Sequence, residues 1–427
     1  MKRVLILSMF LLLFAFSAAF ATQTRTLTMG DANMVIHDDN NIWLFPSTIY
    51  DYPEMAIGEF GEYYYYYYDK ENGSYLFTDV GVHYKFGEKK PFVMGLYFTT
   101  KQPNPEFPYD LANFSYTPLD NHRIDLFYSR MLGDNKFGFH FEYLHGARTH
   151  DVDSLYTYNG LPDLTEEKTD AYSFDFGLTM KDGKLDLAAG LALLSWTNTG
   201  FNGHDRTEPD GNMMFHLRGR YFHEVDQKIT LVPHGGFEYW KLAGKEYDDW
   251  QLAEDFGVVT DQDEYKGITF DAGLGLNYTP AAGIMAIGDF GIEFVNETDT
   301  YEDLVDDEWE SREYKYTWLT LPYFKIGIDA VVFDWMDLRM GATSYWVNQK
   351  NEYDYPADYY TDGDPAFTNE YKYSDVENTV YIGAGFHWGN LFIDTHINPE
   401  MILNGFNFIS GREETMNYQV SLKYNMF

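Results

Sequence analysis

The chain has 427 residues, of which 67 are Asp or Glu and 30 are Lys or Arg, so its formal net charge at pH 7 is −37. Such an acidic chain repels phosphates, and we therefore expect no nucleic-acid partner. The chain contains no Cys, which excludes a disulfide framework, a thiolate metal site and anchoring through a lipidated cysteine.

The first 21 residues have the composition of a secretory signal peptide. Lys2 and Arg3 precede an apolar run over residues 4–16, and small residues at positions 19 and 21 form a cleavage site. We therefore expect residues 1–21 to be removed on export. No later apolar run reaches the length of about 18 residues that a membrane-spanning helix needs.

Residues 22–54 are rich in apolar side chains but do not alternate like a strand. Met, Val, Ile, Trp, Leu and Phe side chains favour burial, so this segment should pack against the domain that follows it. Two interpretations remain open. The segment is either a hatch inside that domain or a short cap on its periplasmic side.

Residues 55–427 are predicted to form a β-barrel domain. Ile268, Phe270, Ala272 and Leu274 alternate with polar or small residues, and a strand places successive side chains on opposite faces. The run has about eleven residues, enough to cross a bilayer at a tilt. After a short turn the pattern resumes over residues 284–294. Such hairpins, apolar outside and polar inside, are the repeating unit of a transmembrane β-barrel.

Similar runs predict an all-β, antiparallel transmembrane barrel of about sixteen strands. The runs lie near 55–68, 74–87, 91–100, 120–132, 136–147, 170–180, 184–197, 212–223, 228–241, 264–278, 283–297, 314–333, 337–349, 373–388, 390–397 and 415–427. Short turns alternate with long connections, which include 148–169, 242–263, 298–313 and 350–372. Outer-membrane barrels have short periplasmic turns and longer outer loops. A soluble sandwich is the alternative, but its strands usually have only about five or six residues.

Charged residues on the polar faces are predicted to point into the lumen. They are Asp175, Asp271, Asp289, Glu293, Asp394, Arg218, Arg220 and Arg339. Rings of charge select solutes in pores, although polar residues also simply solvate a water-filled interior. The stretches 124–132 and 314–333 break strict alternation, so their inward residues are not assigned.

The expected outer loops are acidic, above all residues 298–313. Their carboxylates offer oxygen ligands for loosely bound Ca²⁺, or for divalent ions that bridge lipopolysaccharide, but the residues lack EF-hand spacing, and a solvated acidic face is the favoured interpretation. We predict no dedicated cofactor or metal site. The chain lacks a G-x-S-x-G elbow, an H-E-x-x-H motif, a P-loop and a G-x-G-x-x-G loop, so we expect no enzymatic activity.

Two short motifs resemble known outer-membrane proteins. Phe427 after the alternating Tyr418, Val420 and Leu422 resembles the C-terminal signal that the barrel-assembly machinery recognises. In the N-terminal segment, Met29, Gly30 and Ala32, then Asp38 and Asp39, resemble the opening of the FadL-like and PorV-like barrels, and Phe45, Pro46 and Ser47 stand where that group has an Asn-Pro-Ala element. That resemblance implies a hatch built from these residues and a barrel of fourteen strands, so a count of fourteen stays open beside sixteen.

The sequence favours a porin-like channel for small solutes in the outer membrane of a Gram-negative cell, with a preference for cations because of its acidic excess. The resemblance leaves two alternatives, a FadL-like transporter of hydrophobic molecules and a PorV-like accessory barrel that binds exported proteins. The partners expected in each case are outer-membrane lipids, lipopolysaccharide and the barrel-assembly machinery.

Overall fold

The computed structural model describes residues 23–64, 74–100, 121–152, 163–199, 205–248, 259–305, 308–355, 366–397 and 418–426. The expected signal peptide and Phe427 lie outside these residues. The strands are β1 (Met55–Tyr64), β2 (Ser74–Phe86), β3 (Phe92–Thr100), β4 (Asn121–Leu132), β5 (Asn135–Val152), β6 (Asp163–Met180), β7 (Leu185–Thr199), β8 (Asp205–Pro209), β9 (Met213–Tyr221), β10 (His223–Glu224), β11 (Ile229–Asp248), β12 (Val259–Ala281), β13 (Ile284–Val305), β14 (Glu308–Phe333), β15 (Met336–Tyr355), β16 (Phe367–Trp388), β17 (Leu391–Ile397) and β18 (Tyr418–Asn425).

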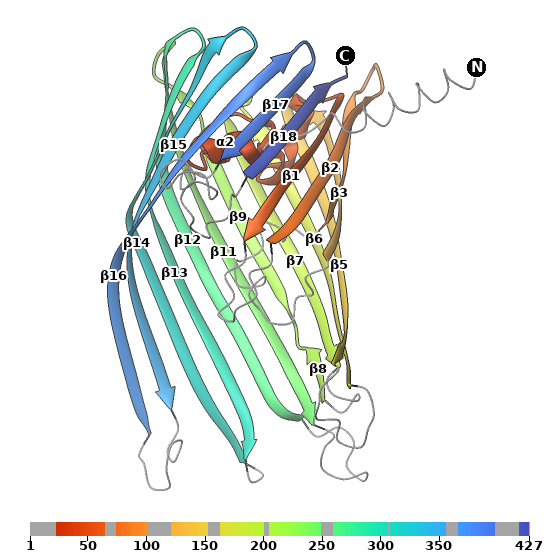
Figure 1. Cartoon of the computed structure of the whole chain (residues 1–427), viewed down its shortest axis with the longest axis vertical. Helices are drawn as coiled ribbons and strands as arrows, with labels where there is room; N and C mark the ends of the chain where they lie inside the picture. The colour runs from red at the N-terminus through yellow and green to blue at the C-terminus, as the bar shows by residue number, and fades with distance from the viewer. Residues whose placement is uncertain are drawn as a thin grey trace, which may run out of the picture.

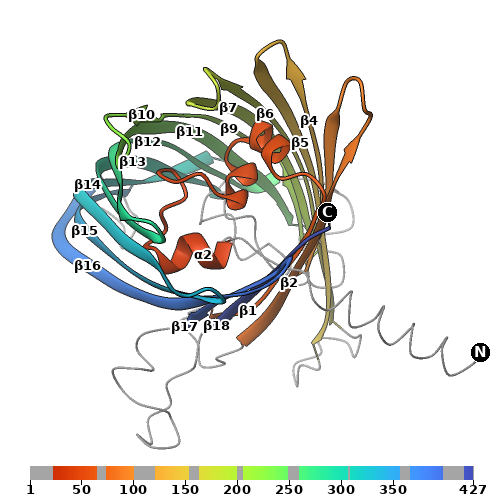
Figure 2. The ribbon, with the colours of Figure 1, turned by 90° about the horizontal axis from the view of Figure 1, so that it is seen from above.

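The strands close into one antiparallel barrel (Figures 1 and 2). Apart from β8, β9 and β10, each strand pairs with its neighbours in the sequence, and β1 pairs with β18 to complete the ring. The short segments β8, β9 and β10 all pair with β11, and β8 and β9 also pair with β7, so the three together make a single barrel strand. The barrel therefore has sixteen strands, which confirms the predicted all-β class and the higher of the two counts.

Alternation along the strands separates an apolar outer face from a polar inner face. Leu274 and Phe290 are 48% and 50% exposed on the outside, whereas Asp175 and Asp289 are 4% and 7% exposed. Near the short turns, the outer face carries stacked aromatic rings. The centroids of Phe333 and Trp335 lie 5.5 Å apart. Aromatic girdles of this kind mark the edge of the apolar band in membrane barrels.

The outer ends of the strands correct the sequence-based prediction of long loops. Residues 298–313, expected as an acidic loop, belong almost entirely to β13 and β14, which run to Val305 and from Glu308. Likewise β11, β12, β15 and β16 extend well into the expected loops 242–263 and 350–372. The strands continue there without an apolar outer face, because both faces of a segment beyond the apolar band meet water.

Two features explain why alternation fails in the unassigned stretches. In β14 the pairing with β15 shifts between Thr320 and Tyr323, so both of these residues are buried although they are three positions apart. In β4 the inward-facing Phe127 is apolar and only 1% exposed. It packs against Trp43 of the N-terminal segment, with ring centroids 5.1 Å apart.

The N-terminal segment lies inside the barrel ring, at the end where the short turns are found (Figures 1 and 2). It contains one helix, α2 (Gln23–Thr28), and two 3-10 turns, η1 (Asp39–Trp43) and η2 (Pro46–Asp51). None of the helices in the described ranges has the length and apolar character needed to cross a membrane.

The face assignment leads to a stability prediction. Leu274→Arg should lower the free energy of unfolding in a bilayer by about 2–4 kcal/mol, because the charge would enter the apolar band. Thr269→Arg on the same strand should change it little, since Thr269 is an inward residue opposite Glu238. Urea titrations of both variants in lipid vesicles would measure this. Equal losses would mean that Leu274 does not face lipid.

Candidate functional site: the hatch and its seat in the lumen

Residues 23–54, which we call the hatch, fold through local capping and burial. The Asp38 side chain accepts a hydrogen bond from the backbone of Asn40, and the Asn41 side chain accepts one from the backbone of Asp38, so the two residues close a capping box. The predicted hatch residues Met29, Gly30, Ala32, Asp38, Asp39, Phe45 and Pro46 are all buried. A segment with so many buried side chains has a defined place in the lumen.

Inward-facing glycines of the barrel wall lie where the hatch packs against it. A methyl group at Gly138 on β5 would overlap the backbone of Ser47, and one at Gly341 on β15 would overlap the backbone of Gly30. Similar close approaches involve glycines on four other strands, namely Gly95, Gly275, Gly327 and Gly383. Glycine permits this approach because it lacks a Cβ. The hatch therefore contacts the wall on several sides of the ring.

Arg220 on β9 is the central polar contact between hatch and wall. Its guanidinium donates to the carbonyl oxygens of Asn33 and Ile36, at 3.0 and 2.9 Å, and to Oδ1 of Asn41 at 2.8 Å. Its Nε donates to Asp186 of β7 at 2.9 Å. The side chain is fully buried, and the ring of Phe45 lies 4.6 Å from its guanidinium carbon. One side chain thus satisfies several backbone carbonyls of the hatch at once.

Four further ion pairs join the hatch to other parts of the wall. Lys423 pairs with Asp39 at 2.7 Å, Lys325 with Asp31 at 3.0 Å, Lys136 with Asp51 at 2.5 Å, and Arg25 with Asp329 at 3.0 Å. Their wall partners come from β18, β14 and β5, so the contacts are distributed around the ring.

The two adjacent hatch carboxyls titrate differently. Burial alone would raise the pKa of Asp38, but the neighbouring Arg25 guanidinium holds that pKa below its ordinary value. Burial raises the pKa of Asp39 to about 7, even though Lys423 lies beside it. Two carboxyls this close do not both ionise freely. As the pH rises, Asp38, which faces Arg25, therefore loses its proton before Asp39 does.

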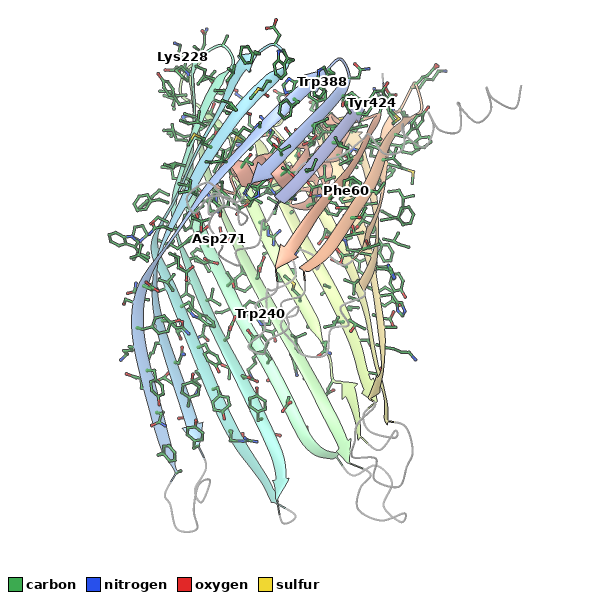
Figure 3. All side chains as sticks on the ribbon, in the orientation of Figure 1. Phe60, Lys228, Trp240, Asp271, Trp388 and Tyr424 are labelled. Carbon is green, nitrogen blue, oxygen red and sulfur yellow. The ribbon has the colours of Figure 1, made fainter. Side chains whose placement is uncertain are left out.

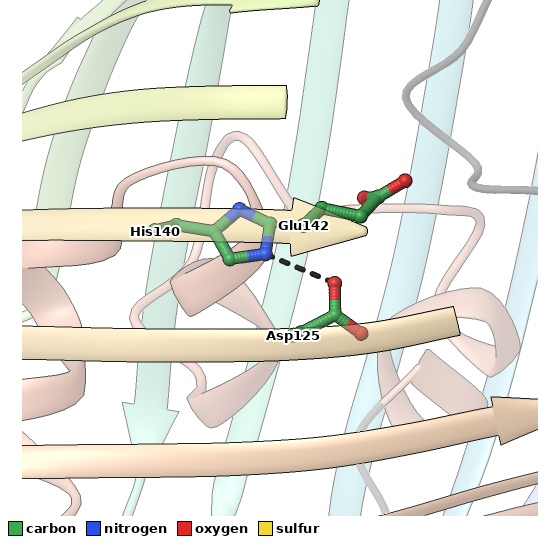
Figure 4. Close-up of side chains that lie close together, drawn as sticks. All are labelled: Asp125, His140 and Glu142. Carbon is green, nitrogen blue, oxygen red and sulfur yellow. Dashed lines mark hydrogen bonds and ion pairs between the residues drawn. The ribbon is translucent and has the colours of Figure 1, made fainter. Parts of the chain in front are cut away.

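A second buried group of charges lies where the hatch meets β4, β5 and β6 (Figure 4). His140 lies between two carboxylates, 3.0 Å from Asp125 and 2.8 Å from Asp175. Ligand atoms of Asp125, His140 and Glu142 all lie within 4.8 Å of one another, so these three could together hold a divalent metal. However, carboxylates at both ring nitrogens favour the doubly protonated ring, and a metal would have to displace one proton. We therefore interpret the group as a buried ion-pair network.

The structure divides the predicted lumen charges into separate groups. Arg339 pairs with Asp394, Asp337 and Asp329 next to the hatch. Asp175 belongs to the His140 network, and Asp289 accepts from His234 at 2.9 Å. Arg218 pairs with Glu238 at 2.5 Å. Asp271 and Glu293 lie directly opposite each other on β12 and β13, and the Asp271 side chain is visible in Figure 3.

The inner face also carries an apolar patch, formed by Ala192, Met214, Trp240, Leu242 and Tyr265. Trp240 is only 2% exposed, and Gly267 opposite it leaves room for its ring (Figure 3). The lumen is thus partly apolar, which simple strand alternation does not predict.

Sequence reasoning missed several residues of this site. Asp125 lies in the stretch whose alternation fails, while His140 and Glu142 lie in a predicted strand but were not singled out. The signal that could have found His140 and Glu142 is their spacing of two, which places both on the inner face of β5. The contacts of Arg220 with the hatch carry no local signal, because Asn33 and Arg220 are 187 residues apart.

No known family model matches the sequence, and no curated protein matches it either. Among solved structures, the chain is similar to the toluene transporter TodX from Pseudomonas putida, with 12% identity, a TM-score of 0.37, and 96% of this chain and 99% of that chain covered. It is also similar to the ferric yersiniabactin uptake receptor FyuA from Yersinia pestis, with 7% identity, a TM-score of 0.36, and coverage of 87% and 79%. The ferric-catecholate import receptor Fiu from E. coli K12 gives 7% identity, a TM-score of 0.35, and coverage of 87% and 81%. These values do not assign the chain to a family.

Proposed function

We propose that this chain is a gated transport barrel of the outer membrane, in which the hatch closes the lumen and moves to admit small solutes. The observation that carries the proposal is the seating of residues 23–54 on inward glycines and Arg220. A permanently open porin does not need these contacts between an inner segment and the barrel wall. The exposed apolar outer face and its aromatic girdle support a place in a membrane.

A reversible cross-link tests whether the hatch must move. Ser47 Oγ in the hatch lies 2.8 Å from Thr179 Oγ1 on β6, so Ser47→Cys with Thr179→Cys should form a disulfide in a chain that has no other Cys. In planar bilayers we expect channel openings under reducing conditions and their loss after oxidation. Each single Cys variant is the control.

Openings that persist unchanged in the oxidised double variant would contradict a moving hatch. A barrel that stays silent in both states, and also after the hatch is deleted, would favour the accessory-barrel alternative. Transport of hydrophobic molecules is a second candidate function. The apolar patch around Trp240 favours it, because a purely aqueous pathway does not require a buried indole on its wall.

Cation preference follows from the acidic pair Asp271 and Glu293. These carboxylates lie directly opposite each other on the adjacent strands β12 and β13. Each attracts cations into a lumen with low-dielectric walls. In the hatch-deleted barrel, Asp271→Asn with Glu293→Gln should reduce the cation-to-anion permeability ratio. The effect should grow at low salt, where the Debye length is about 30 Å at 0.01 M. Reversal potentials in a salt gradient measure the ratio, and anion preference in the parent barrel would contradict the assignment.

A further inference from the structure

The wall formed by β12 to β16 extends far beyond the part that a membrane would cover. These strands have 20 to 26 residues. At about 3.3 Å per residue and a tilt of about 40°, they rise roughly 50–65 Å, against an apolar band about 25 Å tall. Their outer ends therefore form a tall extension on the side away from the hatch (Figure 1).

The outward face of this extension is built from ion pairs. Lys315 pairs with Glu313 at 2.6 Å on β14, and Lys350 pairs with Glu352 at 2.5 Å and with Glu370 at 3.1 Å across β15 and β16. Exposed ion pairs of this kind belong in water. The outward face of the extension is thus charged, whereas the outward face lower on the same strands is apolar.

The inward face of the extension is aromatic. Tyr316 and Trp318 lie on the same face of β14 as the buried Thr320, and the pairing register places Tyr353 of β15 on that face too. Ring centroids are 5.5 Å apart for Tyr301 and Tyr314, 5.2 Å for Tyr314 and Tyr353, and 5.6 Å for Tyr353 and Tyr371. We call Tyr301, Tyr314, Tyr316, Trp318, Tyr353 and Tyr371 the aromatic face.

Carboxylates lie among these rings. Asp299 is directly opposite Tyr314, and Glu297 is directly opposite Tyr316. The Asp299 carboxylate accepts a hydrogen bond of 2.6 Å from the hydroxyl of Tyr301. The faces of aromatic rings carry negative potential and attract cations, and the carboxylates add full negative charges beside them.

The arrangement reverses the usual amphipathic order of a membrane strand, because here the rings face inward and the charges face outward. Cross-strand aromatic pairs would stiffen the wall on either face. Only on the inner face do they meet a solute that approaches the lumen, and Tyr371 keeps 58% of its surface exposed.

From the rings, their carboxylates and their inward position, we propose that the aromatic face binds organic cations, such as quaternary or aromatic ammonium compounds. The apolar body of such a solute would lie on the rings, and its charge would lie near Asp299 and Glu297. This inference rests on the proposed transport function, for which it names the class of solute.

Equilibrium binding tests the inference separately from transport. The full-length protein with the oxidised Ser47→Cys and Thr179→Cys pair is titrated calorimetrically, in a non-ionic detergent, with benzyltrimethylammonium, benzyl alcohol, benzenesulfonate and maltose. We expect benzyltrimethylammonium to bind and the other three to bind at least about tenfold more weakly, because they lack the cation. With the hatch locked, the result does not depend on whether the hatch moves.

Variants locate the site. Tyr316→Leu with Tyr353→Leu should weaken binding at least about fivefold, as the loss of two exposed cation–π contacts predicts. Asp299→Asn with Glu297→Gln should weaken it as well and lower its salt dependence. Trp346→Leu is the matched control, because Trp346 lies on β15 but faces outward and is 51% exposed. All variants are first shown to run as folded barrels in unheated electrophoresis.

Three results would overturn the inference. These are no binding of benzyltrimethylammonium, equally strong binding of benzyl alcohol or maltose, and equal weakening by Trp346→Leu. Any of them would leave the aromatic face as a structural feature of the wall and would not affect the hatch experiments. Conversely, a locked barrel that still conducts would contradict the gate while leaving the binding result intact.

Discussion

Deletion of residues 23–50 is expected to leave a folded barrel whose conductance rises from a closed baseline to a steady open-channel level. The closure of the barrel does not depend on this segment, because β1 begins at Met55 and pairs directly with β18 from Met55 to Gly61. Without the hatch, water should fill the lumen of a sixteen-stranded barrel. Planar-bilayer recordings of the deleted and intact chains measure the difference.

The cost of the deletion to the barrel should be small. Wall residues that lose hatch partners, such as Lys423 and Lys325, would then face water instead of a buried site. Resistance to detergent unfolding, compared with the intact chain, is the control for folding. Unchanged conductance in a folded barrel would mean that the hatch does not block the pathway, and loss of folding would mean that the hatch is part of the wall.

The strand count could be predicted because alternation in the apolar band is a local signal. Ile268 to Leu274 shows it clearly, and β12 pairs along this whole stretch with β13, from Ile268 opposite Asn296 to Leu274 opposite Phe290. The signal requires one face to meet lipid. Where the strands leave the apolar band, as in residues 298–313, both faces become polar or aromatic and the same segment resembles a loop.

The contacts of the hatch could not be predicted for a different reason. Sequence reasoning placed Arg220 on the inner face but gave no information about which inner residue lies beside the hatch. Phe127 is apolar but faces inward, so it breaks the pattern of polar residues on the inner face. The structure explains this exception, because Trp43 of the hatch packs against its ring. Both features depend on a segment whose position in the lumen is set by contacts distant in sequence.

Arg220→Met is expected to release the hatch while the ring of strands stays intact. The substitution removes the hydrogen bonds to the backbone of Asn33 and Ile36 and leaves Asp186 as an uncompensated buried carboxylate. Removing one partner of a buried ion pair costs about 3–5 kcal/mol. This is a large part of the free energy that can keep a short segment bound to the barrel wall. Hydrogen exchange is followed by mass spectrometry in the parent protein and in the variant. The substitution should accelerate exchange in residues 23–54 more than in β9 and β11.

Two further variants distinguish the origin of the effect. Arg220→Met with Asp186→Asn removes the unpaired charge and should recover part of the protection of the hatch, but not all of it, because the carbonyl contacts remain lost. Arg218→Met is the matched control. Arg218 lies two residues away on the same strand and pairs with Glu238 of the wall. If Arg218→Met and Arg220→Met accelerate exchange in the hatch equally, a general loss of lumen charge would explain the result, and Arg220 would not be the residue that seats the hatch.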